Sequence, residues 1–304
     1  MKKVIVRLAN GLGNQLFIYA AAYAFAKKNN MKLIVDNESG FYKRYKYELH
    51  NFNITSQLAD KNQKFVGFAG RARRKFLKNL DKIKKEKRFL VENTKKNKLT
   101  FYNEEQFNII SGETLYFEGY FQSDKYFKSY KNDILNEFKF KEEVKNQKSS
   151  FIEMLQTKNS VSIHIRQDKF LKSEGHKDLT KLNKENLKIS IKNALNGVRF
   201  FDKNLDSPKY FIWSNNFNDL REYFNERKFT FINENLQKDA AYDLYLMSLS
   251  KNFILSPSTL HYWGAFLSSN EKKICLAPSN ILNKSGYYGF SNNKDIKADW
   301  WTNI

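Results

Sequence analysis

The sequence of 304 residues has a single cysteine, Cys275, which excludes an intramolecular disulfide. Because Cys275 lies in the apolar run 274–277, we expect it to be a small buried side chain. Only four histidines accompany it, and their spacing does not match a zinc site. Three prolines and twelve glycines in the whole chain argue against a low-complexity protein.

Long uncharged runs are also missing from the sequence. No apolar stretch approaches the length of a membrane span. The apolar run at the N-terminus is too short for a signal peptide, and Arg7 interrupts it. We therefore expect a soluble protein of a reducing compartment, by default the cytoplasm.

The chain has a large excess of positive charge, formally +21. Such an excess attracts anions, which include nucleic acid, an acidic membrane surface and a phosphorylated substrate. A surface rich in lysine for no functional reason is the alternative. With 41% apolar residues the chain can bury a large core, and its length fits two domains.

The first half begins with a strand over residues 3–8, a glycine-containing turn over 10–15, an amphipathic helix and a strand over 31–35. This order is a βαβ unit. The turn lacks both the third glycine of a dinucleotide fingerprint and the lysine of a P-loop. Gly11 and Gly13 could bind phosphate or could only bring helix and strand close together.

Two further stretches of the first half are basic. Residues 41–52 are aromatic and basic, which suits a loop over a carbohydrate or an anion. Residues 70–98 predict a helix with one buried edge, formed by Phe76, Leu77, Leu80 and Ile83, and a basic outer face. That design suits an anionic membrane, and a solvated helix face is the alternative.

The second half alternates between strands and helices, which predicts a parallel sheet. We expect strands at 161–166, 210–213, 229–232, 252–255 and 273–277, and helices at 184–196, 217–226, 239–250 and around 263–267. With a charged linker at 132–150, the fold class is α/β: two Rossmann-like domains, 1–150 and 151–304, that face each other across a cleft.

Polar residues follow three strands of the second half, at one edge of the predicted sheet. They are His164, Arg166, Ser214, Asn215, Ser256, Ser258 and Thr259. An arginine fork that faces the start of a helix at Ser258 suits a diphosphate. Asp243 is the one acid on an apolar helix and can accept the two N–H donors of guanine, or face solvent. No Asp-x-Asp pair follows a strand, so we expect no metal.

A family resemblance joins these motifs. Residues 11–17, Gly-Leu-Gly-Asn-Gln-Leu-Phe, resemble the Gly-Leu-Gly-Asn-Gln-Met-Phe opening of the bacterial α-1,2-fucosyltransferases, a GT-B family that uses GDP-fucose. Residues 119–127, 163–166, 243–248 and 258–265 are similar to later motifs of that family, in the same order. The resemblance covers nearly the whole chain.

The resemblance implies roles by position. Arg166 binds the β-phosphate of GDP with His164 beside the nucleotide, Asp243 reads guanine, and Asn14 lies near the transferred sugar. Ser258 and Thr259 bind phosphate or ribose, and we add Ser214, Ser256, Gly11 and Gly13 to the nucleotide side. Gln167, Asp168 and Lys169 depart from the second arginine, glycine and aspartate of the family motif. Asp168, Asp36 and Glu118 are the candidates for a general base.

We therefore expect an inverting, metal-independent transfer of L-fucose from GDP-fucose to a galactoside, most simply with an α-1,2 linkage, in surface glycan synthesis. The acceptor is a galactose-containing oligosaccharide or a lipid-linked glycan, and peripheral contact with the anionic inner membrane is a further expectation. The alternatives are another GDP-sugar, a basic nucleic-acid-binding protein, and a nicotinamide oxidoreductase with Asp36 on the ribose. No nucleic-acid-binding module is recognisable, so we expect no nucleic-acid partner.

Overall fold

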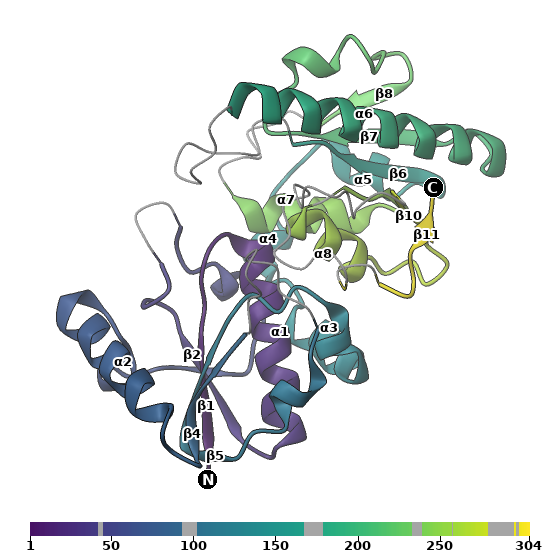
Figure 1. Cartoon of the computed structure of the whole chain (residues 1–304). Helices are drawn as coiled ribbons and strands as arrows, with labels where there is room; N and C mark the ends of the chain where they lie inside the picture. The colour runs from purple at the N-terminus through teal and green to yellow at the C-terminus, as the bar shows by residue number, and fades with distance from the viewer. Residues whose placement is uncertain are drawn as a thin grey trace. The chain divides into compact units, whose positions relative to one another are not determined.

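The structure is a computed structural model that describes residues 1–41, 45–92, 102–166, 179–232, 239–256, 258–278, 295 and 298–304 (Figure 1). The chain divides into two compact units. Unit 1 comprises Met1–Lys141 and Ser291–Ala298, and unit 2 comprises Glu142–Phe290 and Asp299–Ile304. Each unit is an α/β assembly around one parallel sheet, as the sequence predicts.

The sheet of unit 1 has five parallel strands in the order β3-β2-β1-β5-β4. Their bounds are β1 Lys3–Arg7, β2 Lys32–Asp36, β3 Gln57–Leu58, β4 Lys87–Val91 and β5 Ser111–Glu118. The central strand β1 pairs with both β2 and β5, and Val4, Ile5 and Val6 are fully buried. The predicted strands at 3–8 and 31–35 are confirmed.

Helix α1 (Leu12–Lys28) lies against β1 and β2. The sequence predicts one apolar face, but every residue from Leu12 to Ala26 except Asn14 is buried. The sheet covers one side, and the 3-10 segments Leu49–Asn51 and Asp124–Tyr126 cover another. The amphipathic prediction for this helix is therefore wrong.

Helix α2 (Gly67–Asp81) contacts β4 and carries the basic run. The predicted apolar edge is only partly correct: Leu77 and Leu80 are half-buried, whereas Phe76 is 62% exposed and Ile83 is 84% exposed. Asp81 is buried and accepts the backbone N–H groups of Arg88 and Phe89. The chain then continues as β4, so the single basic helix predicted across 70–98 is wrong between Asp81 and Val91, and residues 93–98 lie outside the described part of the chain.

The connection between the units contains three short helices, α3 (Lys131–Glu137), α4 (Glu142–Lys145) and α5 (Phe151–Leu155). Helices α4 and α5 pack against α7 (Ala240–Leu249) of unit 2. For this reason the division falls after Lys141, whereas the sequence suggested a boundary after residue 150. Further 3-10 segments are Lys61–Gln63, Glu104–Phe107, Lys128–Tyr130 and Asn218–Leu220.

The sheet of unit 2 has six parallel strands in the order β11-β10-β9-β6-β7-β8. Their bounds are β6 Ser160–His164, β7 Lys209–Trp213, β8 Phe229–Phe231, β9 Asn252–Ile254, β10 Cys275–Ala277 and β11 Thr302–Asn303. The five predicted strands are present and Cys275 is buried, as expected. Strand β11 was not predicted.

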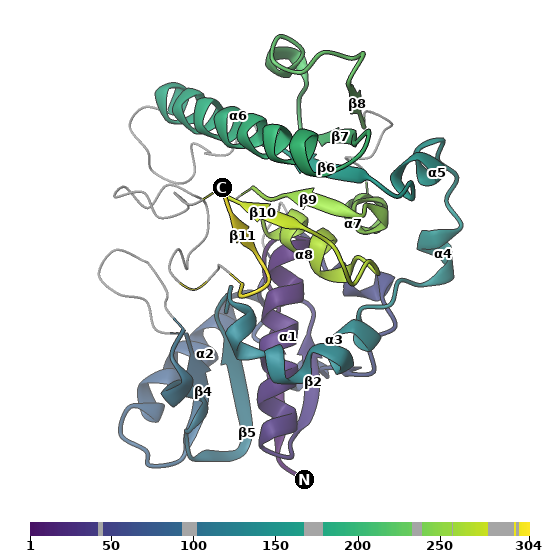
Figure 2. The same cartoon turned by 90° about the vertical axis from the view of Figure 1, so that its right-hand side faces the viewer.

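Three helices cover this sheet: α6 (Leu179–Asn204), α7 (Ala240–Leu249) and α8 (Thr259–Leu267). Helix α6 lies on one face, and α7 and α8 lie together on the other (Figures 1 and 2). Ile191, Ala194 and Val198 of α6 pack into the same core as the strand residues. The helix predicted at 217–226 is wrong, because β7 is followed there by a 3-10 turn and further turns.

Candidate functional site

The carboxyl ends of β6 and β9 form one polar edge in unit 2. Ile163 is in register with Ile254, so the residues that follow the two strands are neighbours. His164 Nδ1 lies 3.1 Å from Ser256 Oγ, a hydrogen-bonding distance. Arg166, two residues beyond His164, is exposed at this edge. Ligands of open parallel sheets bind at such an edge.

The start of α8 lies at the same edge. Ser258 is its N-cap, and Ser258 Oγ accepts the backbone N–H of His261 at 3.3 Å. The backbone N–H of Ser258 donates to the carbonyl of Ser256 at 2.7 Å, which holds the two serines in one turn. Thr259 is the first residue of the helix. The remaining N–H groups of the first turn and the helix dipole favour an anion here.

A buried histidine, His261, packs next to His164 at this edge. His261 is fully buried, its ring centroid lies 5.5 Å from that of His164, and its Nε2 lies 3.1 Å from Ser162 Oγ. Burial is the main cause that holds the pKa of His261 well below its usual range, and the nearby His164 lowers this pKa further. The ring is therefore neutral at pH 7. His261 lies within the motif at 258–265, and the sequence predicts no role for it because burial is not visible in the pattern.

Ser214 follows β7 and is engaged in its own turn. Its Oγ donates to the carbonyl of Asn216 at 2.5 Å and accepts the N–H of Asn216 at 3.2 Å. The hydroxyl therefore shapes the loop after β7, at the edge to which His164 and Ser256 also belong.

Asp243 lies on α7 with a carboxyl oxygen in an unusual environment. Its Oδ1 is buried and has no hydrogen-bond partner among the described residues. Loss of solvent is the main cause, and the negative charge of Asp239 the second, that raises the pKa of Asp243 to about 8. Asp239 itself caps the helix by accepting the N–H groups of Ala241 and Tyr242. A buried acceptor without a partner needs an explanation, and a ligand with N–H donors supplies one.

In unit 1 the turn after β1 holds Asn14 in place. Gly11 is the N-cap of α1, and its carbonyl accepts the N–H groups of Asn14 and Gln15. Asn14 Oδ1 accepts a hydrogen bond from Gln122 Nε2 at 2.6 Å. Gln122 was missed as a partner of Asn14, since 108 residues separate the two in sequence. Gly13 is buried inside the first turn of the helix.

Two of the three candidate bases lie in unit 1 and have structural partners. Asp36 Oδ1 accepts the backbone N–H groups of Glu38 and Ser39. Glu118 accepts from Arg74 and Lys78. The third candidate, Asp168, lies outside the described residues, as do Gln167 and Lys169. Within the described part of the chain, no group of three His, Cys, Asp or Glu side chains could hold a metal ion.

Comparison with known proteins agrees with this geometry. Residues 3–304 match the model of Glycosyl transferase family 11. The chain is 27% identical over 298 residues to an alpha-1,2-colitosyltransferase of Escherichia coli, with 92% of each chain covered. It is 25% identical over 315 residues to the O-antigen biosynthesis glycosyltransferase WbnK of Escherichia coli, with 98% of this chain and 99% of the relative covered.

A solved structure with a similar fold is a mutant of Arabidopsis thaliana FUT1 in complex with GDP. It has a TM-score of 0.55 at 14% identity and covers 90% of this chain and 70% of the other. This likeness bears on the fold alone. Together with the two parallel sheets, it identifies a GT-B fold built of two Rossmann-like units.

Proposed function

This chain belongs to glycosyl transferase family 11 and is a glycosyltransferase; we propose that it transfers L-fucose from GDP-fucose to a galactoside with an α-1,2 linkage. The single observation that carries the donor class is the polar edge of unit 2, where His164, Ser256 and the start of α8 follow adjacent strands. The name of one relative supports the α-1,2 linkage. That name also favours colitose as the second candidate for the transferred sugar.

The reaction inverts the anomeric carbon in one displacement. The bond from C1 of the sugar to the β-phosphate oxygen breaks, and a bond from C1 to the acceptor oxygen forms. Negative charge then collects on the leaving GDP. Arg166 and the N-terminus of α8 stabilise that charge electrostatically, so that no metal is required. His164, held by Ser256, lines the same edge.

Asp243 reads the base. A carboxylate accepts two N–H donors from the edge of guanine, and adenine offers no such pair. Because the pKa of Asp243 is about 8 without a ligand, guanine binding must first ionise the group at pH 7. The affinity for GDP therefore rises as the pH approaches and passes about 8, because the ionised fraction of Asp243 grows until the pH exceeds its pKa.

The proton of the acceptor hydroxyl needs a base. Glu118 and Asp36 already accept hydrogen bonds within unit 1, which makes both poor candidates. Asp168 therefore remains the candidate that we propose. Asn14, oriented by Gln122, contacts the transferred sugar in this account.

We also propose a galactose-containing oligosaccharide or a lipid-linked glycan as the acceptor, since one relative is named for O-antigen biosynthesis. Peripheral contact with an anionic inner membrane is supported by α2, where Phe68 is 82% exposed near exposed basic residues. Among the described helices, none is long and apolar enough to cross a membrane. If α2 binds the surface, F68S/F76S reduces co-flotation with anionic vesicles, whereas unchanged flotation contradicts the contact.

The experiment for the main proposal is a donor screen. The purified chain is incubated with GDP-fucose, other GDP-sugars and UDP-sugars, together with a β-galactoside, and products are identified by mass spectrometry with linkage analysis. We expect a fucosyl product from GDP-fucose, with full activity in a chelator. Turnover with UDP-sugars alone, or activity lost in the chelator and restored by a divalent ion, contradicts the proposal.

A further inference from the structure

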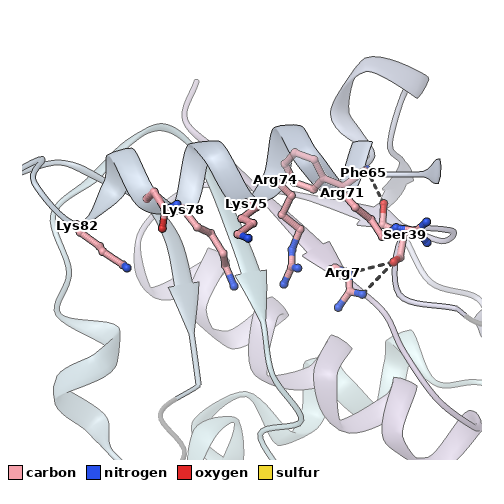
Figure 3. A pocket seen from close by; sticks show the side chains of 9 residues that line it. Arg7, Ser39, Phe65, Arg71, Arg74, Lys75, Lys78 and Lys82 are labelled. Carbon is pink, nitrogen blue, oxygen red and sulfur yellow. Dashed lines mark hydrogen bonds between the residues drawn. The ribbon is translucent and has the colours of Figure 1, made fainter. Parts of the chain in front are cut away.

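Unit 1 contains a strongly basic pocket that the proposed donor site does not use. It has a volume of about 480 Å³ and lies between α2, the last residue of β1 and the loop after β2 (Figure 3). Six of its nine lining residues are cationic. The lining residues are Arg7, Ser39, Phe65, Arg71, Arg74, Lys75, Lys78, Asn79 and Lys82.

One carboxylate neutralises part of this charge. Glu118, the last residue of β5, is 4% exposed and accepts from Arg74 Nε at 2.6 Å and from Lys78 Nζ at 2.7 Å. Burial alone would raise the pKa of Glu118, but the hydrogen bonds and charges of Arg74 and Lys78 outweigh it and lower that pKa. Glu118 is therefore ionised and supplies one negative charge for two cations.

The other lining cations have no carboxylate paired with them in the described part of the chain. Arg71, Lys75 and Lys82 have no ion-pair partner among the described residues. Arg7 donates from Nε and Nη2 to the carbonyl of Ser39, at 3.2 and 2.9 Å, which brings no negative charge. The pocket thus keeps a net positive charge that its own walls do not balance.

The spacing of these cations along α2 is unfavourable in isolation. Arg71 and Lys75 are four residues apart on one side of the helix, and Lys78 has the same spacing to Lys82, the C-cap of α2. Like charges at this spacing repel and destabilise a helix. Figure 3 shows the side chains of Arg71, Arg74, Lys75 and Lys78 extending from α2 on the pocket side. An anion between them would convert the repulsion into attraction, and the concave wall concentrates the field.

We propose that this pocket binds a phosphate or diphosphate group carried by the acceptor. The guanidinium group of arginine donates two parallel hydrogen bonds to a pair of phosphate oxygens. A pocket of this volume can hold a phosphate or diphosphate group but is too small for a nucleic-acid duplex. Arg7 ends β1, and the turn that leads to Asn14 begins directly after it, so both belong to the carboxyl edge of this sheet. The assignment to the acceptor rests on the proposed function, in which the donor diphosphate occupies unit 2.

The test uses two exposed cations that do not contact Glu118. R71Q/K75Q removes two lining charges, and it also relieves a repulsive pair, so the fold is expected to be retained. K188Q/K192Q is the matched control, because Lys188 and Lys192 are exposed on α6 with the same spacing. Equal melting temperatures of both variants and the parent chain establish that the substitutions leave the fold intact.

Binding of inorganic pyrophosphate is measured by calorimetry on the full chain, in an R166A background that removes the proposed donor contact. We expect binding that R71Q/K75Q weakens at least about tenfold and that K188Q/K192Q leaves unchanged. Equal binding to R71Q/K75Q overturns the pocket. This result does not depend on which sugar is transferred, so it separates failure of the pocket from failure of the proposed function.

Kinetics then identify the source of the phosphate. Two acceptors are compared, the same galactoside with a free reducing end and with a prenyl diphosphate at that end. We expect R71Q/K75Q to lower kcat/KM at least about tenfold for the diphosphate acceptor only. An equal effect on both acceptors contradicts the proposal. The proposal is also contradicted if R71Q/K75Q loses binding to phosphatidylglycerol vesicles but binds pyrophosphate as the parent does, since the pocket would then recognise a lipid surface.

Discussion

Replacement of Asp243 by asparagine is expected to stabilise unit 2 while weakening the binding of GDP. The carboxyl oxygen Oδ1 is buried without a hydrogen-bond partner among the described residues, and the pKa of Asp243 lies at about 8 instead of the ordinary 3.8. A raised pKa means that the folded state holds the proton more tightly than the unfolded state. The resulting stability is fully present below pH 3.8 and is lost as the pH rises to about 8.

The magnitude follows from the size of this shift. At pH 7 Asp243 is ionised in the unfolded state and protonated in the folded state. This difference lowers the free energy of unfolding by at most about 4 kcal/mol, because pH 7 lies roughly three units above the pKa of the unfolded state and each unit corresponds to about 1.4 kcal/mol. Relaxation of the protein and access of water reduce the effect, so we expect D243N to gain about 2 kcal/mol at pH 7. The gain should shrink below pH 5 and level off above pH 8.

The assay is urea unfolding of the parent chain and of D243N between pH 4 and 9. D219N is the control, because Asp219 is an exposed acid in a turn of the same unit. In parallel, the affinity for GDP is measured between pH 6.5 and 8. We expect the ratio of the parent affinity to the D243N affinity to rise about tenfold over this range. The ratio is used because the titration of the GDP phosphate affects both proteins equally. Stability differences that do not vary with pH would refute the assignment of a raised pKa.

Two further predictions concern unit 1. E118Q leaves Arg74 and Lys78 without their carboxylate and should lower the free energy of unfolding of unit 1 by about 2 kcal/mol, measured by urea unfolding. The expected loss is smaller than for a fully buried ion pair because both cations are partly exposed. G40A should lower the melting temperature by several degrees or prevent folding, because a Cβ at Gly40 would lie 1.8 Å from the carbonyl oxygen of Leu8.

Each of these substitutions has its own check. G112A is the control for G40A, since a Cβ at Gly112 makes an ordinary contact of 3.6 Å, and equal melting temperatures would contradict the steric reasoning. For E118Q, inorganic phosphate should restore part of the lost stability, because an anion in the pocket replaces the missing charge. An unchanged unfolding curve in E118Q would show that the pair contributes nothing.

The sequence predicted β6 to β10 of unit 2 because each is a short apolar run between helical or polar segments, whereas β11 has no such pattern. Its failures have physical causes. Helix α1 reads as amphipathic, yet segments far along the chain bury the rest of its surface. The basic residues of α2 were expected on the outside, but Glu118, 44 residues from Arg74, draws two of them inward. A partner so distant in sequence has no local signature.

The candidate site divides in the same way. Strand ends and the cap at Ser258 can be read from the sequence, because parallel strands place their carboxyl ends on one edge. The neutral His261 and the raised pKa of Asp243 depend on burial, which the pattern does not report. The basic pocket depends on the packing of α2 against β4, which was predicted as part of the same helix.

The role of Arg166 is tested by the turnover of R166A with GDP-fucose and a galactoside, measured as release of GDP. If Arg166 stabilises the leaving diphosphate, kcat should fall about a hundredfold, the equivalent of roughly 3 kcal/mol of transition-state stabilisation. R199A, in which an exposed arginine of α6 is removed, should keep the parent rate. Turnover of R166A close to that of the parent chain would contradict the account.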